Sequence, residues 1–199
     1  MALFAGQPGA HNSNQPHPTM ASTPSQDIKK IAIIGPECTG KSELSEYLAQ
    51  HFNTAWVSEY ARAYLDNLNA PYSESDLLKI AHGQVRLEEE WMPEANRVLI
   101  CDTNLLVIKV WSNFKYGRCS GEILQLINSR AYDLYLLTYI DIPWQEDPLR
   151  EHPDKREELW GIYKKELAQQ GTPFVEIKGE RAARRATAIK AIEGLLTEG

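Results

Sequence analysis

The feature that most constrains the fold of this chain is a glycine-rich run placed between an apolar segment and an amphipathic one. Residues 35–42, Gly-Pro-Glu-Cys-Thr-Gly-Lys-Ser, match the pattern G-x-x-x-x-G-K-[ST] at every fixed position. Residues 31–34 form a short apolar run before it, and Leu44 and Leu48 lie four residues apart after it. A strand, a glycine-rich turn and a helix in this order are the context in which the pattern holds phosphate. The run therefore predicts a P-loop.

The chemistry of this loop follows from its backbone. Its glycines let the chain curl so that N–H groups face phosphate oxygens, and the helix N-terminus adds a partial positive charge. Lys41 is expected to reach the β- and γ-phosphates of ATP, and the Ser42 hydroxyl is expected to ligate Mg²⁺. The predicted nucleotide-binding residues are Gly35, Pro36, Glu37, Cys38, Thr39, Gly40, Lys41, Ser42 and Glu43.

Beyond the loop, short apolar runs alternate with helical patterns. Strands are expected at residues 31–34, 55–57, 98–101, 134–140 and 174–177. A long helix is expected to open at Ser73 or Ser75, and a later one to start with a capping-box-like Asp154 and Glu157 and to stop at Gly171. Strands that alternate with helices imply a parallel three-layer α/β domain. We expect this domain over residues 27–199, after a disordered tail of polar, Gly- and Pro-rich residues 1–26.

Composition and net charge limit the binding partners and the cellular compartment that we expect for this chain. The 199 residues, 43% hydrophobic, are enough for one domain with a core. A net charge of −6 gives no general attraction for nucleic acid or an anionic membrane. The sequence has no apolar run near the ~20 residues of a membrane span, no signal-peptide pattern and no CxxC pair among its cysteines. We expect a cytoplasmic protein without nucleic-acid or membrane partners, and the sequence carries no signal for an oligomeric state.

Polar residues follow two predicted strands at the edge where parallel α/β domains bind their substrates. Asp102 ends the third strand, where a carboxylate can hold the water shell of Mg²⁺, and a plain surface turn is the alternative. Glu59, Tyr60 and Arg62 follow the second strand. Glu59 can accept a hydroxyl proton or hold a sugar hydroxyl, and Arg62 can hold an anion. A helix start whose Glu only complements the helix dipole is the competing interpretation.

A polar, proline-bounded stretch follows the fourth strand. A mobile lid there, at about residues 142–156, can close over ATP and bring Arg150 to the developing phosphoryl charge, whereas the plain alternative is a solvated charged loop. Gln84 lies on the long helix between strands two and three, where it can face the acceptor. The basic run of Arg181, Arg184 and Arg185 is interpreted as a solvated helix face. The tryptophans at positions 91, 111 and 160 are interpreted as core or helix-face anchors.

Together these motifs resemble the ribosylnicotinamide kinase domain of the NadR type, within the P-loop kinase superfamily, over about residues 29–177. The matching positions are Gly35, Glu37, Thr39, Gly40, Lys41 and Ser42, then Glu59, Tyr60, Arg62 and Tyr64, then Ile80, Ala81, Gly83 and Arg86, then Asp102 and Thr103, and last Asp147, Leu149 and Arg150. The resemblance implies transfer of the ATP γ-phosphate to the ribose 5′-hydroxyl of nicotinamide riboside, which gives nicotinamide mononucleotide in NAD salvage. It also implies a five-stranded parallel sheet in the order 2-3-1-4-5.

The resemblance assigns roles to the candidate residues. Glu59 and Arg62 would face the nucleoside. Asp102 would face the metal and the attacking hydroxyl, and Arg150 would belong to the lid. The predicted catalytic residues are Lys41, Asp102, Glu59 and Arg150, the predicted substrate-binding residues are Glu59, Tyr60, Arg62, Gln84 and Asp102, and the predicted metal ligands are Ser42 and Asp102.

Some positions depart from the family pattern. Ala63 and Asn104 each replace an acidic residue near the expected acceptor, and Cys38 stands where serine is frequent. The sequence has no H-x-G-H run, and nothing before Ile28 can supply the adenylyltransferase half of larger relatives. The expected reaction therefore stops at the mononucleotide.

Two alternatives stay open: a kinase of another nucleoside, nucleotide or metabolite, and a non-catalytic ATP-binding regulator. A GTPase would need an N/T-K-x-D motif and a D-x-x-G after the third strand, and residues 102–105, Asp-Thr-Asn-Leu, do not fit the latter. An AAA-type motor would need a second acid after Asp102, where Thr103 stands, and a helical lid domain for which the chain is too short.

Overall fold

Five strands form a sheet at the centre of the fold, in the order β2-β3-β1-β4-β5. They are β1 (Lys29–Ile34), β2 (Trp56–Val57), β3 (Val98–Asp102), β4 (Leu134–Thr138) and β5 (Phe174–Ile177), and all four pairings are parallel. The structure is a computed structural model that describes residues 27–68 and 70–197, so the predicted tail at residues 1–26 lies outside the described residues. The predicted fold class and strand order are confirmed.

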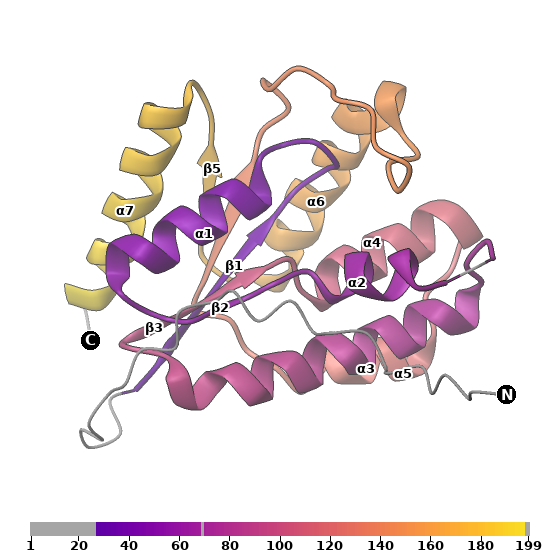
Figure 1. Ribbon diagram of the computed structural model, residues 1–199, viewed down its shortest axis with the longest axis horizontal. Helices are drawn as coiled ribbons and strands as arrows, with labels where there is room; N and C mark the ends of the chain where they lie inside the picture. The colour runs from indigo at the N-terminus through magenta and orange to yellow at the C-terminus, as the bar shows by residue number, and fades with distance from the viewer. Residues whose placement is uncertain (1–26, 69, 198–199) are drawn as a thin grey trace, which may run out of the picture.

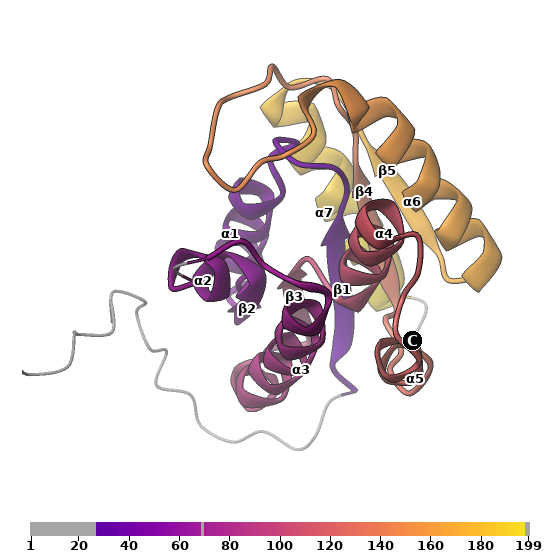
Figure 2. The same ribbon diagram turned by 90° about the vertical axis from the view of Figure 1, so that its right-hand side faces the viewer.

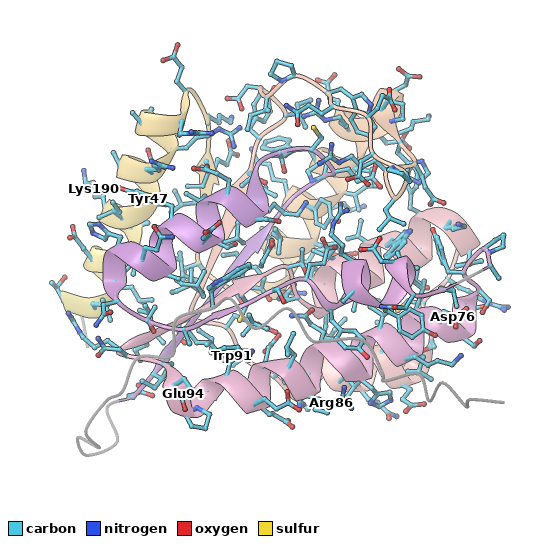
Figure 3. The ribbon with its side chains drawn as sticks, in the orientation of Figure 1. Tyr47, Asp76, Arg86, Trp91, Glu94 and Lys190 are labelled. Atoms are coloured by element: carbon cyan, nitrogen blue, oxygen red, sulfur yellow. The ribbon has the colours of Figure 1, made fainter. Side chains whose placement is uncertain are left out.

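Helices cover both faces of this sheet (Figures 1 and 2). On one face, Ile31 and Ile33 of β1 pack with α1 (Lys41–Phe52) and α7 (Arg181–Thr197). On the other face, Ala32 and Ile34 pack with α4 (Leu105–Tyr116) and α6 (Arg156–Gln170), and Trp91 at the end of α3 (Glu74–Trp91) closes the layer (Figure 3). The central strands read as continuous apolar runs because both of their faces are covered.

The fourth strand is shorter than expected. It ends at Thr138 and not at residue 140, because β1 pairs with it only as far as Ile34 opposite Leu137 and then leaves the sheet at Gly35. The Thr138 hydroxyl donates to the Ile34 carbonyl oxygen at 3.1 Å, which closes this corner of the sheet. The P-loop therefore begins where the sheet loses its central strand.

The helix starts agree with the sequence in one case and differ in another. Ser73 is the N-cap of α3, and its backbone N–H donates to the Asp76 carboxylate at 2.8 Å in a capping box. The box expected from Asp154 and Glu157 is wrong: Asp154 lies in the short 3₁₀ helix η2 (Pro153–Lys155), and α6 follows without a side-chain cap. The predicted stop at Gly171 is confirmed by its left-handed φ of 70°.

The remaining helices are α2 (Tyr60–Asp66), α5 (Gly121–Asn128) and the 3₁₀ helix η1 (Met92–Glu94). Helices α2 to α5 share a separate apolar cluster at one end of the sheet. Within residues 27–68 and 70–197, no helix combines the length and the apolar character that crossing a bilayer requires.

Gly83 sets how closely α2 approaches α3. A Cβ atom at Gly83 would lie 2.0 Å from Cε1 of Tyr60, far inside van der Waals contact. The Tyr60 backbone N–H also donates to Gln84 Oε1 at 2.9 Å. Because Glu59 is the N-cap residue of α2, this contact fixes where the Glu59 side chain stands.

The substitution Gly83→Ala is expected to lower the free energy of unfolding by about 1–3 kcal/mol, because the added methyl group overpacks the α2–α3 interface. Gly161→Ala is the matched control: Gly161 also lies inside a helix, but a Cβ there meets nothing within 4 Å. It should raise the free energy of unfolding by about 0.5–1 kcal/mol. Urea denaturation measures both. Equal stabilities for the two variants would contradict close packing of α2 on α3.

Candidate functional site

The P-loop joins β1 to α1 at the carboxyl edge of the sheet (Figure 1). Gly35 has a φ of 145°, and a Cβ atom there would lie 2.4 Å from Thr138 Oγ1 and 2.7 Å from the Thr138 carbonyl oxygen. Gly40 caps α1 with a left-handed φ of 75°. Gly35 must be glycine because the backbone there approaches β4 too closely for a side chain. Gly40 must be glycine because its backbone is left-handed. The two fixed glycines of the motif thus have separate structural reasons.

Two side chains hold the loop from behind. The buried Thr39 hydroxyl donates to the Pro36 carbonyl oxygen at 2.8 Å and lies 2.7 Å from Thr138 Oγ1. Arg184 of α7 is 5% exposed, and its guanidinium donates to the carbonyl oxygens of Thr39 (2.8 Å), Tyr139 (2.8 Å) and Gly179 (2.9 Å). One arginine therefore ties the P-loop to the segments that follow β4 and β5.

The interpretation of residues 181, 184 and 185 as a solvated face is wrong for two of the three arginines. Arg184 is buried, and Arg185 pairs with Glu43 and stacks 3.8 Å from the Tyr47 ring centroid on α1 (Figure 3). Only the Arg181 side chain, 71% exposed, faces solvent. The reason is that α7 packs on α1, so this part of α7 lies behind the P-loop. Helical spacing alone does not distinguish a packed basic face from a solvated one.

Lys41 and Ser42 begin α1 directly after the loop. The Lys41 ammonium donates to the Pro36 carbonyl oxygen at 2.9 Å and so lies folded over the loop. The Ser42 hydroxyl lies close enough to the Asp102 carboxylate to favour its charged form. Asp102 is opposite Ile33 in the β1–β3 pairing, which places the end of β3 beside the loop. The structure therefore brings the two predicted metal ligands together.

Asp102 is a buried acid with an incomplete set of partners. It is 2% exposed, and its Oδ1 atom has no hydrogen-bond partner among the described residues. Burial, helped by the nearby Glu59 carboxylate, raises the pKa of Asp102 to about 6, against the opposing effects of the Ser42 hydroxyl and the Lys41 ammonium. Mg²⁺ prefers oxygen ligands and is ordinarily held by one or two protein groups together with phosphates. The unpartnered carboxylate oxygen and the serine hydroxyl fit that ion.

A cavity of about 320 Å³ lies between the P-loop, α2, α4, α6 and the segment after β4. It is lined by all nine predicted P-loop residues and by Glu59, Arg62 and Arg150. Tyr60 and Gln84 are placed differently, in the interface of α2 and α3, and they are not on the cavity wall. Their predicted contact with a substrate stays a prediction.

The cavity also has an apolar wall that the sequence analysis missed. It is formed by Leu65, Val107, Trp111, Phe114, Leu149 and Tyr163. Trp91, Trp111 and Trp160 all pack against core clusters as expected, and Trp111 lines the cavity as well. A signal was present, because residues 107, 111 and 114 are spaced to share one face of a helix.

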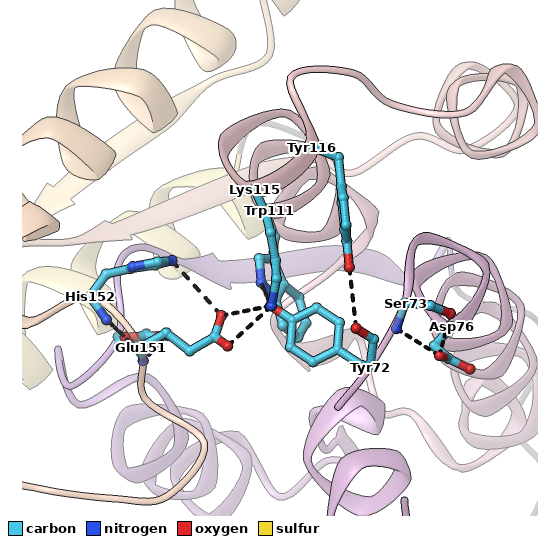
Figure 4. Close-up of polar contacts among 9 residues, drawn as sticks. Tyr72, Ser73, Asp76, Trp111, Lys115, Tyr116, Glu151 and His152 are labelled. Atoms are coloured by element: carbon cyan, nitrogen blue, oxygen red, sulfur yellow. Dashed lines mark hydrogen bonds and ion pairs between the residues drawn. The ribbon is translucent and has the colours of Figure 1, made fainter. Parts of the chain in front are cut away.

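The segment between β4 and η2, residues 139–152, covers the cavity and is bonded to the helices around it. Asp147 pairs with Arg62 of α2 at 3.1 Å. The Glu151 carboxylate accepts from the Tyr72 hydroxyl at 2.6 Å and from the Lys115 ammonium at 3.2 Å (Figure 4). The Trp111 indole N–H in turn donates to the Tyr72 hydroxyl oxygen at 2.7 Å. The same network thus orients the wall of the cavity and the segment that covers it.

Comparisons with known proteins agree with this geometry. A protein-family model described as an AAA domain matches residues 30–184. The trifunctional NAD biosynthesis/regulator protein NadR of Escherichia coli (strain K12) is 30% identical over 161 residues, which are 77% of this chain and 39% of that protein. The chain therefore spans well under half the length of this curated relative.

Two solved structures share the fold. A NadR protein in complex with NR superposes with a TM-score of 0.71 at 21% identity, over 85% of this chain and 50% of that chain. A NadR protein in complex with NAD and AMP-PNP gives a TM-score of 0.67 at 22% identity, with the same coverage of 85% and 50%. At these identities the likeness shows the fold.

The substitution Asp102→Asn is expected to raise the free energy of unfolding by about 1–3 kcal/mol near pH 7.5, because it removes a buried charge. The carboxyl binds more protons in the folded chain than in the unfolded chain between its ordinary pKa of 3.8 and its folded pKa of about 6. The wild-type protein therefore loses stability as the pH rises through that window, and the gap to the variant should close as the pH falls toward about 4.

Urea denaturation over a pH series measures this gap. Asp66→Asn, at an exposed carboxylate of α2, is the matched control and should stay within about 0.5 kcal/mol of the wild type. A gap of constant size across the pH series would contradict a raised pKa at Asp102.

Proposed function

The chain belongs to the AAA domain family, and from that premise we propose that it is an ATP-dependent kinase which phosphorylates nicotinamide riboside on the ribose 5′-hydroxyl. The product would be nicotinamide mononucleotide, an intermediate of NAD salvage. The NadR resemblance expected from the motifs is confirmed by the sequence identity to NadR. What NadR does as a whole protein comes to this chain as part of the proposal.

The single observation that carries the proposal is that one cavity joins the P-loop to an acidic and aromatic wall. At one end lie Lys41 and the loop backbone, which suit the phosphates of ATP. At the other lie Glu59, Trp111 and Phe114. A phosphoryl donor and a ring-bearing hydroxyl acceptor can therefore occupy the same enclosed space, as direct transfer requires.

Each catalytic role follows from position. Lys41 and Arg150 supply positive charge where the transferring phosphoryl group develops negative charge. Ser42 and Asp102 would hold Mg²⁺, which when bound neutralises charge on the β- and γ-phosphates. Because transfer of a phosphoryl group is mainly a matter of positioning and charge, these groups account for most of the chemistry that the chain itself must provide.

The two acids at the sheet edge have different surroundings, and this supports different roles. Glu59 lines the cavity at the start of α2, where it can hold or deprotonate the acceptor hydroxyl. Asp102 is buried behind it, beside Ser42, where a metal and the incoming hydroxyl can be reached together. We assign acceptor binding to Glu59 and the metal to Asp102.

Nicotinamide riboside suits the wall of the cavity by its charge. Its pyridinium ring is a cation, and aromatic faces such as those of Trp111, Phe114 and Tyr163 attract cations by about 0.5–2 kcal/mol. Two departures from the family pattern, Ala63 and Asn104, also lie off the cavity wall, whereas Cys38 lines it with the rest of the P-loop. Ala63 is exposed on α2, and the Asn104 amide donates to the Tyr135 hydroxyl oxygen at 3.1 Å. Neither change therefore removes a carboxylate from the wall.

A kinase for another acceptor is the second candidate. The Glu59 carboxylate and the aromatic wall suit any ring-bearing substrate with a free hydroxyl. The family description as an AAA domain does not by itself imply a motor. Thr103 follows Asp102 where a motor has its second acid, and the Thr103 backbone N–H is used within the sheet, donating to the Ile33 carbonyl oxygen at 3.0 Å.

A panel of nucleosides tests the proposal. ATP-to-ADP turnover is measured with nicotinamide riboside, uridine, cytidine and thymidine side by side, and the highest kcat/KM is expected for nicotinamide riboside. Lys41→Ala is the inactive control, since loss of its charge should lower turnover by at least about 100-fold. Higher kcat/KM with a pyrimidine nucleoside would establish the second candidate. Turnover in Lys41→Ala equal to the wild type would remove the kinase assignment.

The variant Glu59→Gln tests whether Glu59 contacts the acceptor and not ATP. It should raise the KM for the nucleoside, lower kcat if Glu59 is the base, and leave the KM for ATP nearly unchanged. Asp102→Asn should instead lower kcat strongly with little change in the nucleoside KM, because its contact matters most in the transition state. Steady-state kinetics with each substrate varied separately measures both. An effect of Glu59→Gln on ATP alone would place the acceptor elsewhere.

A further inference from the structure

Glu37 is an acidic residue in the middle of a loop that is built to hold phosphate. Its carboxylate is directed at the segment that covers the cavity, where it accepts hydrogen bonds from two consecutive backbone N–H groups. The Glu151 N–H lies 3.1 Å from Oε2 and 3.2 Å from Oε1, and the His152 N–H lies 3.1 Å from Oε2. These contacts span 114 and 115 residues of sequence.

The negative charge of Glu37 needs compensation in a loop that holds phosphate. A free carboxylate beside the phosphates of a nucleotide would repel them by several kcal/mol at low effective dielectric. Two N–H donors that point at the carboxylate spread its charge over the backbone of residues 151 and 152. The carboxylate is therefore an anchor for the covering segment, and its two donors make its presence in the loop tolerable.

The anchored peptide lies between two residues of the cavity wall. Arg150 precedes it and His152 is part of it, and both line the cavity. The Nε2 atom of His152 is buried and has no hydrogen-bond partner among the described residues. Any shift of the peptide at residues 151 and 152 would move both side chains relative to the P-loop.

The P-loop also contacts the segment at other points, since the Cys38 thiol donates to the Pro143 carbonyl oxygen at 3.4 Å and accepts from the Gln145 backbone N–H at 3.2 Å. Arg156 donates to the carbonyl oxygens of Cys38 (3.0 Å) and Ile142 (2.9 Å), and so joins the two ends of the segment to the loop. The Arg150 guanidinium itself donates only within the segment, to the Gln145 carbonyl oxygen at 2.5 Å. Glu37 is thus the P-loop side chain that binds the backbone of residues 151 and 152, while the Glu151 side chain is held separately by Tyr72 and Lys115.

We propose that Glu37 is a positioning residue, whose carboxylate docks the backbone of residues 151 and 152 on the P-loop and thereby sets Arg150 over the reacting phosphate. The catalytic part of this statement rests on the proposed kinase function. The docking part does not, because it concerns the order of the segment and can be measured without substrate.

Docking is tested by limited trypsin digestion of the full chain, with the fragment that ends at Arg150 followed by mass spectrometry. Glu37→Ala should raise the cleavage rate after Arg150 about tenfold, and Glu37→Gln should raise it less because its amide oxygen still accepts one hydrogen bond. Cleavage after Arg118, whose side chain is 74% exposed, is the internal control and should not change. Glu46→Gln, at an exposed acid of α1, is the matched control variant.

Positioning is tested by a double-mutant cycle on kcat. Glu37→Ala should lower kcat about tenfold with little change in the nucleoside KM, and Glu37→Gln should restore part of the loss. In the Arg150→Ala background, Glu37→Ala should cause almost no further loss, because the group through which it acts is absent. Thermal unfolding of each variant confirms that it is folded.

The outcomes separate the two proposals. Unchanged cleavage after Arg150 in Glu37→Ala would overturn the docking role, and equal losses in both backgrounds would overturn the positioning role. Absence of kinase activity in the wild type would reject the proposed function, while the digestion would still decide whether Glu37 docks the segment.

Discussion

The site depends on how the outward carbonyl groups of the P-loop are satisfied. A loop that turns its N–H groups inward to hold phosphate must turn carbonyl oxygens outward, and these need donors when they are buried. The Pro36 oxygen accepts from the Thr39 hydroxyl, the Cys38 oxygen from Arg156, and the Thr39 oxygen from Arg184. Two of these donors come from α6 and α7, far along the chain. The shape of the loop is therefore fixed by the completed fold.

This dependence explains what the sequence could and could not predict. The strands, the loop and Asp102 could be placed because apolar runs, glycine spacing and strand ends are local patterns. The spacing of Arg184 and Trp111 places each on a helix face, but that spacing is the same whether the face meets solvent, core or cavity. The start of α6 was missed for a related reason: Pro153 begins a 3₁₀ turn there, so the acids around it cap nothing. The sequence does not show which helix faces pack against the P-loop and which line the cavity.

The charge around the cavity differs from the net charge of the whole chain. The chain carries a net charge of −6, yet Lys41, Arg62 and Arg150 all line the cavity. The acids of the loop are occupied: Glu43 pairs with Arg185, and Glu37 accepts from backbone N–H groups. Glu59 on the cavity wall and the buried Asp102 are the acids to which we assign the acceptor and the metal, and Oδ1 of Asp102 has no partner among the described residues.

Two buried carboxylates lie at opposite edges of the sheet, Glu88 on α3 and Asp102 at the end of β3, and their surroundings differ. Glu88, 2% exposed, lies at the amino edge of the strands, where its oxygens accept from the Lys30 ammonium and the Tyr132 hydroxyl, each at 2.6 Å. Asp102 is buried to the same degree at the carboxyl edge, but one of its oxygens has no partner in the described chain. The next residue, Thr103, has a φ of 69°, a strained value for a β-branched residue. Strain and an unsatisfied charge cost stability, and their concentration beside the P-loop distinguishes the carboxyl edge of the sheet from the amino edge, which supports the metal site that we propose for Ser42 and Asp102.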